Sequence, residues 1–390
     1  MRKRFLLLII TLILIAAGRE QAIAQKDSLL IEYLLNRIQQ QVAQNDPAFS
    51  DGLFPSYINK TERFSRGNPD NSIFFTALTD FTLQQIRPEL NAYRQSKIDS
   101  IVSQTLPAFA HFKNRKGRNT YNFWRTDTAT VYPYAGWLFD KSITLPDDMD
   151  DTVLSLMVQK AADSTAKEVH LLMQSFTNNG QSTLRNPIRA FDKIPAYSTW
   201  FGKKFPVVFD VSVLCNILTF VQSYGLDWTN ADSASLQLIV KTIENNYHLD
   251  IPVYVSPYYP KTSLILYHLS RLMRTKPIPE LEQLKVKLIA DAAFGLQHSS
   301  DLLEKIIYST AILNWGYLPP PVELPDISEV EQLIEQNNFS FFLGNIPSYF
   351  PDLLKKLATT NGLGMFYHYC PAYYNALLLE YIVLQNNGVR

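Results

Sequence analysis

The sequence has little glycine, little charge and almost no cysteine, and each shortage excludes a class of protein. Only 14 of the 390 residues are glycine, roughly half the average share, which favours helices over turn-rich folds. Charged residues make up 18%, and 36 Lys+Arg balance 36 Asp+Glu. Electrostatic binding of nucleic acid needs a basic surplus, so no nucleic-acid partner is expected. Apolar residues make up 46%, which excludes a disordered chain.

The two cysteines, Cys215 and Cys370, are too few for a disulfide framework. No Cys-x-x-Cys pair or clustered Cys/His spacing occurs, so we expect no structural zinc and no other metal site.

The N-terminus has the pattern of an export signal. A basic start, Met1 to Arg4, precedes an apolar run from Phe5 to Gly18, and Ala22-Ile23-Ala24 is typical of a cleavage site. We therefore expect residues 1–24 to be a signal peptide and the mature protein to be periplasmic or extracellular. No later run reaches 18 apolar residues, so no stable transmembrane segment is expected after cleavage.

Two kinds of helix alternate along the rest of the chain. Amphipathic patterns have one apolar stripe, as a surface helix does; they lie near 28–43, 92–108, 164–177, 232–246, 281–290 and 327–336 with 350–358. Patterns that are apolar nearly all round indicate buried helices; they begin near 71, 150, 210, 262, 300 and 374.

Six buried helices that alternate with six exposed ones predict an all-α fold, an (α/α)6 barrel or toroid with six inner and six outer helices. Residues 25–390 would then form one domain. An open solenoid of helix pairs is the rival, but the irregular spacing of the buried helices disfavours it. The closed ring puts Cys215 and Cys370 on opposite sides, so we expect two free, buried thiols.

A cluster of acids begins the second inner helix, in the run Leu145-Pro146-Asp147-Asp148-Met149-Asp150-Asp151-Thr152. Asp before an apolar run is a common N-cap, and Asp210 and Asp301 precede other inner helices in the same way. Four carboxyls in five residues are harder to explain by capping alone, because they repel one another when partly buried.

The segment Asp148-Met149-Asp150-Asp151-Thr152 resembles the Asp-x-Asp-Asp-Thr motif of class II terpene cyclases, such as squalene–hopene cyclases. In that family the motif lies on an inner helix of an α/α toroid. The resemblance implies that Asp150 is the general acid that protonates an alkene or epoxide, and that Asp148 and Asp151 hold and polarise it. It also implies an enzyme of the isomerase or lyase class with an apolar isoprenoid as substrate.

Aromatic residues are abundant, with 23 Phe, 21 Tyr and 5 Trp, and a carbocation needs aromatic faces around it. The candidate wall residues for substrate binding are Trp124, Trp137, Tyr197, Trp200, Tyr258, Tyr259, Trp315 and Tyr373. The loop 193–201 and His368 are expected at the same mouth as the acids, with His368 as a structural histidine.

Three alternatives stay open. Asp147-Asp148-x-x-Asp151 also fits the Asp-Asp-x-x-Asp motif of class I prenyl enzymes, so Mg²⁺ would be a cofactor only if the substrate carries a diphosphate; otherwise no cofactor is expected. Exported (α/α)6 barrels include glycoside hydrolases and polysaccharide lyases, whose aromatic clefts bind a glycan. A non-catalytic toroid that keeps the acidic caps is the third.

Overall fold

The fold is described from a computed structural model, which covers residues 25–128, 145–179, 183–185, 188–203 and 205–388. These residues are mostly helical, as predicted, with one small sheet that the sequence analysis did not predict. The proposed signal peptide, residues 1–24, lies outside the described residues.

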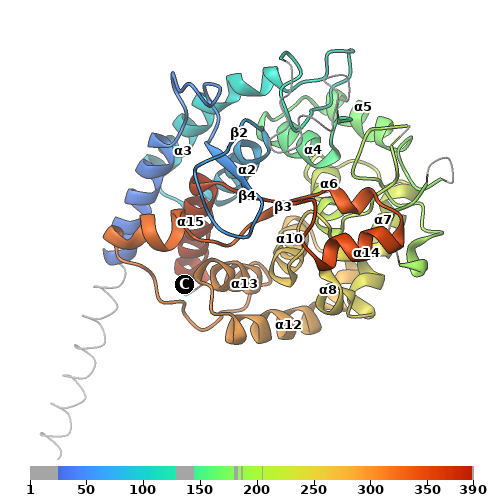
Figure 1. Ribbon diagram of the computed structural model, residues 1–390. Helices are drawn as coiled ribbons and strands as arrows, with labels where there is room; N and C mark the ends of the chain where they lie inside the picture. The colour runs from blue at the N-terminus through green and yellow to red at the C-terminus, as the bar shows by residue number, and fades with distance from the viewer. Residues whose placement is uncertain (1–24, 129–144, 180–182, 186–187, 204, 389–390) are drawn as a thin grey trace, which may run out of the picture.

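Six buried helices begin close to the predicted positions. They are α2 (Phe74–Ile86), α4 (Met149–Val158), α6 (Val211–Ser223), α10 (Thr262–Thr275), α13 (Leu302–Asn314) and α15 (Pro371–Gly388). Each contacts the next along the chain, and α15 contacts α2, so the contacts form a closed cycle. Figure 1 shows the six helices around one centre. Every residue of α4 is buried, which agrees with its unbroken apolar pattern.

Aspartate N-caps begin three of these helices, as the sequence suggested. Asp148 accepts hydrogen bonds from two backbone N–H groups at the start of α4, and Asp210 does the same for α6. Asp301 accepts one from Glu304 at the start of α13. The unpaired N–H groups of a helix start need such acceptors.

Amphipathic helices lie outside the six, as Figure 1 shows for α3, α5, α7 and α12. The outer elements are a helix over residues 25–40, α3 (Ala92–Thr105), α5 (Asp163–Met173), α7 (Asn230–Glu244), α12 (Lys285–His298) and the short π-helix η5 (Glu331–Glu335). Their buried faces follow the predicted stripes; in α7, for example, Leu236, Ile239 and Ile243 are buried. Shorter helices in the connections are α8 (Tyr247–Asp250), α9 (Pro252–Val255) and α11 (Pro279–Glu282).

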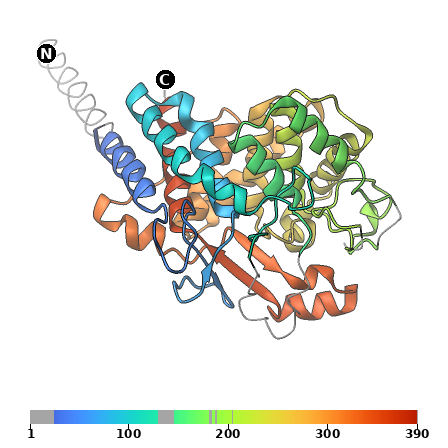
Figure 2. The ribbon, with the colours of Figure 1, turned by 90° about the horizontal axis from the view of Figure 1, so that it is seen from above.

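A four-stranded antiparallel sheet covers one end of the helices, as Figure 2, turned by 90° from Figure 1, shows. Its strands are β1 (Ser56–Asn59), β2 (Pro69–Asp70), β3 (Phe342–Asn345) and β4 (Met365–Tyr369), in the order β2-β1-β4-β3. His368 of β4 lies in register with Ile58 on one side and Phe342 on the other.

Helix α14 (Asp352–Thr360) lies at the same end as the sheet. Residues 350–358 were expected among the outer helices, and this grouping is wrong. Leu354, Leu357 and Ala358 of α14 line a cavity at the end of the ring instead. The two cysteines are both buried free thiols, as predicted.

Candidate functional site

A cavity of about 920 Å³ opens at the end of the helices that carries the sheet and α14. This volume is at the upper end of the range of ligand sites, about 300–1,000 Å³. Its lining is mostly aromatic and aliphatic, and it includes three of the predicted acids: Asp148, Asp150 and Asp151. The acidic motif found in the sequence therefore lies in the wall of a cavity.

Backbone hydrogen bonds from two loops fix the start of α4 at this cavity. The N–H of Asp148 donates to the carbonyl of Tyr121 at 3.0 Å, and the N–H of Met149 donates to the carbonyl of Thr199 at 2.8 Å. The N–H of Phe201 donates to the carbonyl of Asp147 at 2.9 Å. The prediction that the loop 193–201 lies beside the acids is confirmed.

The first two carboxyls of the motif have structural partners. Asp148 Oδ1 accepts from the N–H groups of Asp150 at 2.6 Å and Asp151 at 3.2 Å, so it is the N-cap of α4. Asp147 Oδ2 accepts from Asn114 and Thr120, each at 2.5 Å. Burial and the nearby charge of Asp150 raise the pKa of Asp148 well above its usual value.

Asp150 is buried and both of its oxygens accept hydrogen bonds from side chains. Asn216 Nδ2 donates to Oδ1 at 2.7 Å, and the hydroxyl of Tyr259 donates to Oδ2 in a short hydrogen bond. Burial raises the pKa of Asp150 to about 6, although these two donors and the charge of Arg271 lower it. Donors on both oxygens stabilise the carboxylate that remains once a proton has left.

Asp151 differs from its neighbours because it has no partner. Both of its carboxyl oxygens are buried, and neither has a hydrogen-bond partner among the described residues. Burial and the charges of Asp148, Asp150 and Asp70 raise its pKa well above the usual value. Burial thus favours the protonated form of Asp151, which lines the cavity with its hydrogen-bonding capacity unused among the described residues.

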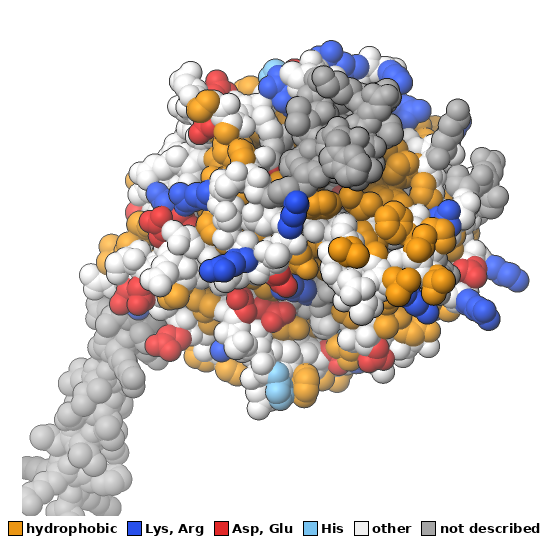
Figure 3. Space-filling model, viewed as in Figure 1, with side chains coloured by type: hydrophobic (Ala, Val, Ile, Leu, Met, Phe, Trp, Pro, Cys, Tyr) orange, Lys and Arg blue, Asp and Glu red, His pale blue; other side chains and the backbone are white. Residues whose placement is uncertain are grey.

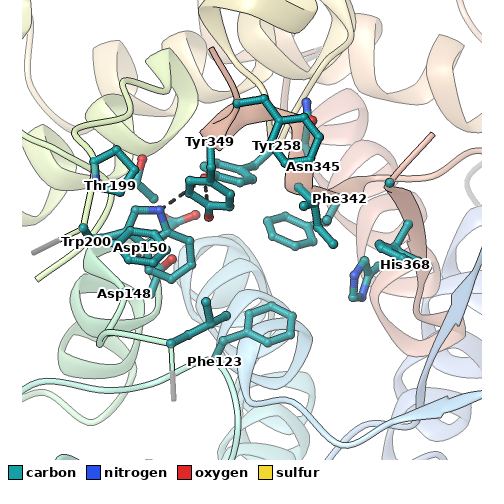
Figure 4. Close-up of a pocket in the computed structure, with 18 of the residues that line it drawn as sticks. Phe123, Asp148, Asp150, Thr199, Trp200, Tyr258, Phe342, Asn345, Tyr349 and His368 are labelled. Atoms are coloured by element: carbon teal, nitrogen blue, oxygen red, sulfur yellow. Dashed lines mark hydrogen bonds between the residues drawn. The ribbon is translucent and has the colours of Figure 1, made fainter. Parts of the chain in front are cut away.

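A second polar group, which the sequence analysis read as structural, lies on the opposite side of the cavity in the view of Figure 4. His368 lines the cavity and its Nδ1 lies 3.2 Å from Asp70 Oδ2. Asp70 also accepts from Trp124 Nε1 at 3.0 Å and from Ser72 at 2.9 Å. Although burial raises it, these hydrogen bonds and the attraction between Asp70 and a protonated His368 ring hold the pKa of Asp70 below its usual value.

The predicted wall residues divide into four groups. Trp124, Trp200 and Tyr258 line the cavity, and Trp200 Nε1 donates to the Tyr258 hydroxyl at 3.2 Å. Tyr259 does not line it but reaches Asp150 through its hydroxyl. Trp137 lies outside the described residues.

The three remaining wall predictions are wrong, because these side chains point into other packing layers. Tyr197 donates to Asp232 at 3.0 Å, between α5 and α7. Trp315 Nε1 lies 3.2 Å from the sulfur of Met273. Tyr373 is buried with its ring against Phe341, at a centroid distance of 4.7 Å.

Several wall residues were missed by the sequence analysis. Phe342 of β3 stacks on Phe123 at 5.7 Å and meets the His368 ring at 5.2 Å, and Tyr349 bonds the Tyr258 hydroxyl at 2.9 Å. The adjacent pair Phe341-Phe342 in a segment read as a loop was the available signal. Aromatic residues are enriched in strands.

Apolar side chains also surround the cavity mouth on the outside. Phe350, Leu354, Leu357 and Leu363 line the cavity and are exposed, with exposed fractions from 36% to 65%. Figure 3 shows hydrophobic side chains gathered over this end of the molecule. The mouth is thus continuous with an apolar surface.

No family model, curated protein or solved structure matches the chain. In the described part of the chain, no helix is long and apolar enough to cross a membrane. Among the same residues, no group of three or more His, Cys, Asp or Glu side chains could hold a metal ion.

Proposed function

We propose that this protein is a cyclase of neutral isoprenoids that starts its reaction by protonating the substrate, with Asp150 as the general acid. The observation that carries the proposal is the buried acid group of Asp148, Asp150 and Asp151 at the wall of a cavity whose lining is otherwise mostly apolar and aromatic. We also propose that the closed cycle of six helices is the inner layer of an (α/α)6 toroid, which the outer amphipathic helices support.

The lining favours an uncharged, apolar substrate over the alternatives. Carboxyls in the wall would repel a diphosphate unless a cation bridged them. A glycan would need many polar partners for its hydroxyls, whereas this wall is made largely of Phe, Trp, Leu and Ile side chains. The unused carboxyl of Asp151 suits a substrate with one oxygen function, such as an epoxide or a hydroxyl.

Proton transfer from Asp150 begins the proposed reaction. The π electrons of a substrate double bond form the new C–H bond, and the Asp150 carboxylate that remains is stabilised by Asn216 and Tyr259. The cation then forms C–C bonds with further double bonds of the same chain. Aromatic faces of Phe123, Phe342 and other wall residues stabilise it within about 6 Å, as ring quadrupoles stabilise a cation.

His368 is the proposed base that ends the reaction. The ionised Asp70 accepts from Nδ1–H, which leaves Nε2 as the proton acceptor. Gly344 keeps that side of the ring open, because a Cβ there would lie 3.2 Å from Nε2. Loss of a C–H proton to Nε2 returns its electron pair to carbon as a new double bond, so the overall change is an isomerisation.

The test is conversion of neutral polyenes by the purified protein in D₂O. We expect squalene or geranylgeraniol to give a cyclic product that carries one carbon-bound solvent deuterium per molecule, seen by gas chromatography and mass spectrometry. Asp150→Asn should abolish the product. Conversion should fall as the pH rises through about 6, because the pKa of Asp150 is raised to that value and only the protonated form is active. No conversion, or a product without deuterium, refutes the proposal.

His368→Gln tests the base. We expect conversion to fall about a hundredfold or more, the usual range for a general base, with alcohols from water capture among the products. The matched control is His170→Gln, because His170 is also buried and paired with a carboxylate, Asp232, at 3.0 Å but lies away from the cavity. Equal losses in the two variants would show that His368 is only structural.

A further inference from the structure

A chain of hydrogen bonds runs from Asp150 to a second buried carboxyl on another inner helix. Asn216 of α6 donates to Asp150 at 2.7 Å, and its Oδ1 accepts from Arg271 Nη2 at 3.2 Å. Arg271 Nη1 lies 3.5 Å from the hydroxyl of Tyr267, which donates to Glu380 Oε2 of α15 at 2.5 Å. Four inner helices, α4, α6, α10 and α15, thus contribute to one polar network.

The network lies beneath the cavity and out of reach of a substrate. Of its members, only Asp150 lines the cavity. Arg271 is 7% exposed and Glu380 is 1% exposed. The guanidinium of Arg271 also lies over the rings of Phe81, at 4.7 Å, and Tyr267, at 5.0 Å.

Arg271 is a permanent charge in this interior, since a guanidinium does not lose its proton in proteins. A buried cation destabilises the fold unless an anion or oriented dipoles compensate it. Two carboxyls are linked to this single cation, Glu380 through Tyr267 and Asp150 through the amide of Asn216. The stronger the interaction of Arg271 with the Glu380 carboxylate, the less Arg271 stabilises the Asp150 carboxylate.

We propose that Arg271 and Glu380 are positioning residues that set the acidity of Asp150. Asn216 extends the stabilising effect of Arg271 to the Asp150 carboxylate, and Glu380 competes for the same cation. The network then absorbs the charge that appears when Asp150 gives up its proton. This inference deepens the proposed function and depends on it only for the role of Asp150 as acid.

Other titratable groups face the same network and remain unchanged in every comparison below. Asp148, Asp151, Tyr259, Asp210 and Cys215 surround Asp150. His268 and Tyr373 face Arg271, and Arg274 faces Glu380. These groups are the same in every variant compared. If the titration midpoint of Asp150 moves in opposite directions when Arg271 and Glu380 are removed, the movements therefore come from those two side chains.

The experiment is a pH titration of the protonated carboxyl band of Asp150 by infrared spectroscopy. The band is identified as the one lost in Asp150→Asn, and no substrate is needed. Burial raises the pKa of Glu380, and its ionised form competes for Arg271. Glu380→Gln removes that carboxyl, so we expect the midpoint to fall by about one pH unit. Arg271→Gln removes the cation, so we expect a rise of about one unit, the lower end of the effect of a nearby opposite charge. Tyr267→Phe keeps both charges and removes the hydroxyl between them, so a fall in the midpoint like that in Glu380→Gln supports coupling through Tyr267, and an unchanged midpoint overturns it.

Asn216→Leu decides whether the amide carries the effect. In this background Arg271→Gln should move the midpoint much less than in the native protein, as a double-mutant cycle measures. Full additivity overturns the role of Asn216.

The control is Glu335→Gln, which removes a buried carboxylate paired with Arg37 at 2.7 Å in another part of the ring. It should lower stability without moving the Asp150 midpoint. Midpoints that do not move, or that move in the same direction in Glu380→Gln and Arg271→Gln, overturn the proposal. If the opposite movements occur but no polyene is converted, the network stands and the cyclase proposal fails.

Discussion

Replacing Asp150 with asparagine should remove a pH-dependent loss of stability while leaving the fold intact. Asparagine has nearly the same shape as aspartic acid but does not titrate. Its side-chain oxygen can still accept from Asn216, whose amide donates at 2.7 Å. Its new NH₂ group can donate to the hydroxyl of Tyr259, which otherwise bonds the carboxylate. Neither partner is left buried without a hydrogen bond.

The magnitude follows from the raised pKa. Burial raises the pKa of Asp150 from 3.8 to about 6, so between these values the native state holds a proton that the unfolded chain has released. The free energy of unfolding therefore falls as the pH rises through this window. A difference of about two units corresponds to about 3 kcal/mol. Between about pH 4 and pH 8, the free energy of unfolding should fall by about 3 kcal/mol less in Asp150→Asn than in the native protein.

Urea unfolding at a series of pH values measures this difference. Other carboxyls with raised pKa values, such as Asp210 at about 7, contribute to both profiles and cancel in the comparison. Asp232→Asn is a control of opposite sign. Although burial raises it, hydrogen bonds from His170 and Thr229 hold the pKa of Asp232 below its usual value. That variant should be more destabilised above pH 4 than at pH 2, in about the range of a buried hydrogen-bonded acid.

Equal slopes for the native protein and Asp150→Asn would refute the reasoning. They would mean that Asp150 stays ionised in the folded state, and an ionised carboxylate cannot protonate an alkene. The cyclase proposal would then lose its acid.

Two further substitutions test the packing of the outer layer by urea unfolding. Glu335→Gln should lower the free energy of unfolding by about 3–5 kcal/mol, because Glu335 is fully buried against Arg37 and this is the usual cost of breaking a buried ion pair. A loss below about 1 kcal/mol would contradict this. Gly295→Ala should cost about 1–3 kcal/mol, since its Cβ would lie 2.3 Å from the ring of Tyr308; an unchanged or higher stability would show that the ring moves freely.

The helical part of the fold could be predicted from the sequence because its signals are local. An aspartate such as Asp210 followed by an apolar run marks the start of a buried helix within a few residues. The sheet could not be predicted in this way. Its central pair joins Ile58 to His368, and nothing near either residue indicates a partner so distant in the chain.

The candidate site, too, could be predicted only where its residues are close together in the sequence. The acids are neighbours in sequence, so their grouping at one helix start was visible in advance. The proposed base depends on a contact between His368 and Asp70, which are 298 residues apart. The wall predictions failed for Tyr197 and Tyr373 because the direction of a side chain depends on packing rather than on its place in a loop.

The closed cycle of helices also constrains the order in which the protein can assemble. Helix α15 contacts both α13 and α2, and β4, just before it, pairs with β1. The ring therefore closes only when the last helix docks against the first. Contacts between such distant parts of a chain form slowly, because the long loop must first be closed. Until that step Glu380 is absent from the interior, so we expect refolding to produce an open helical intermediate whose acid group is still in contact with water.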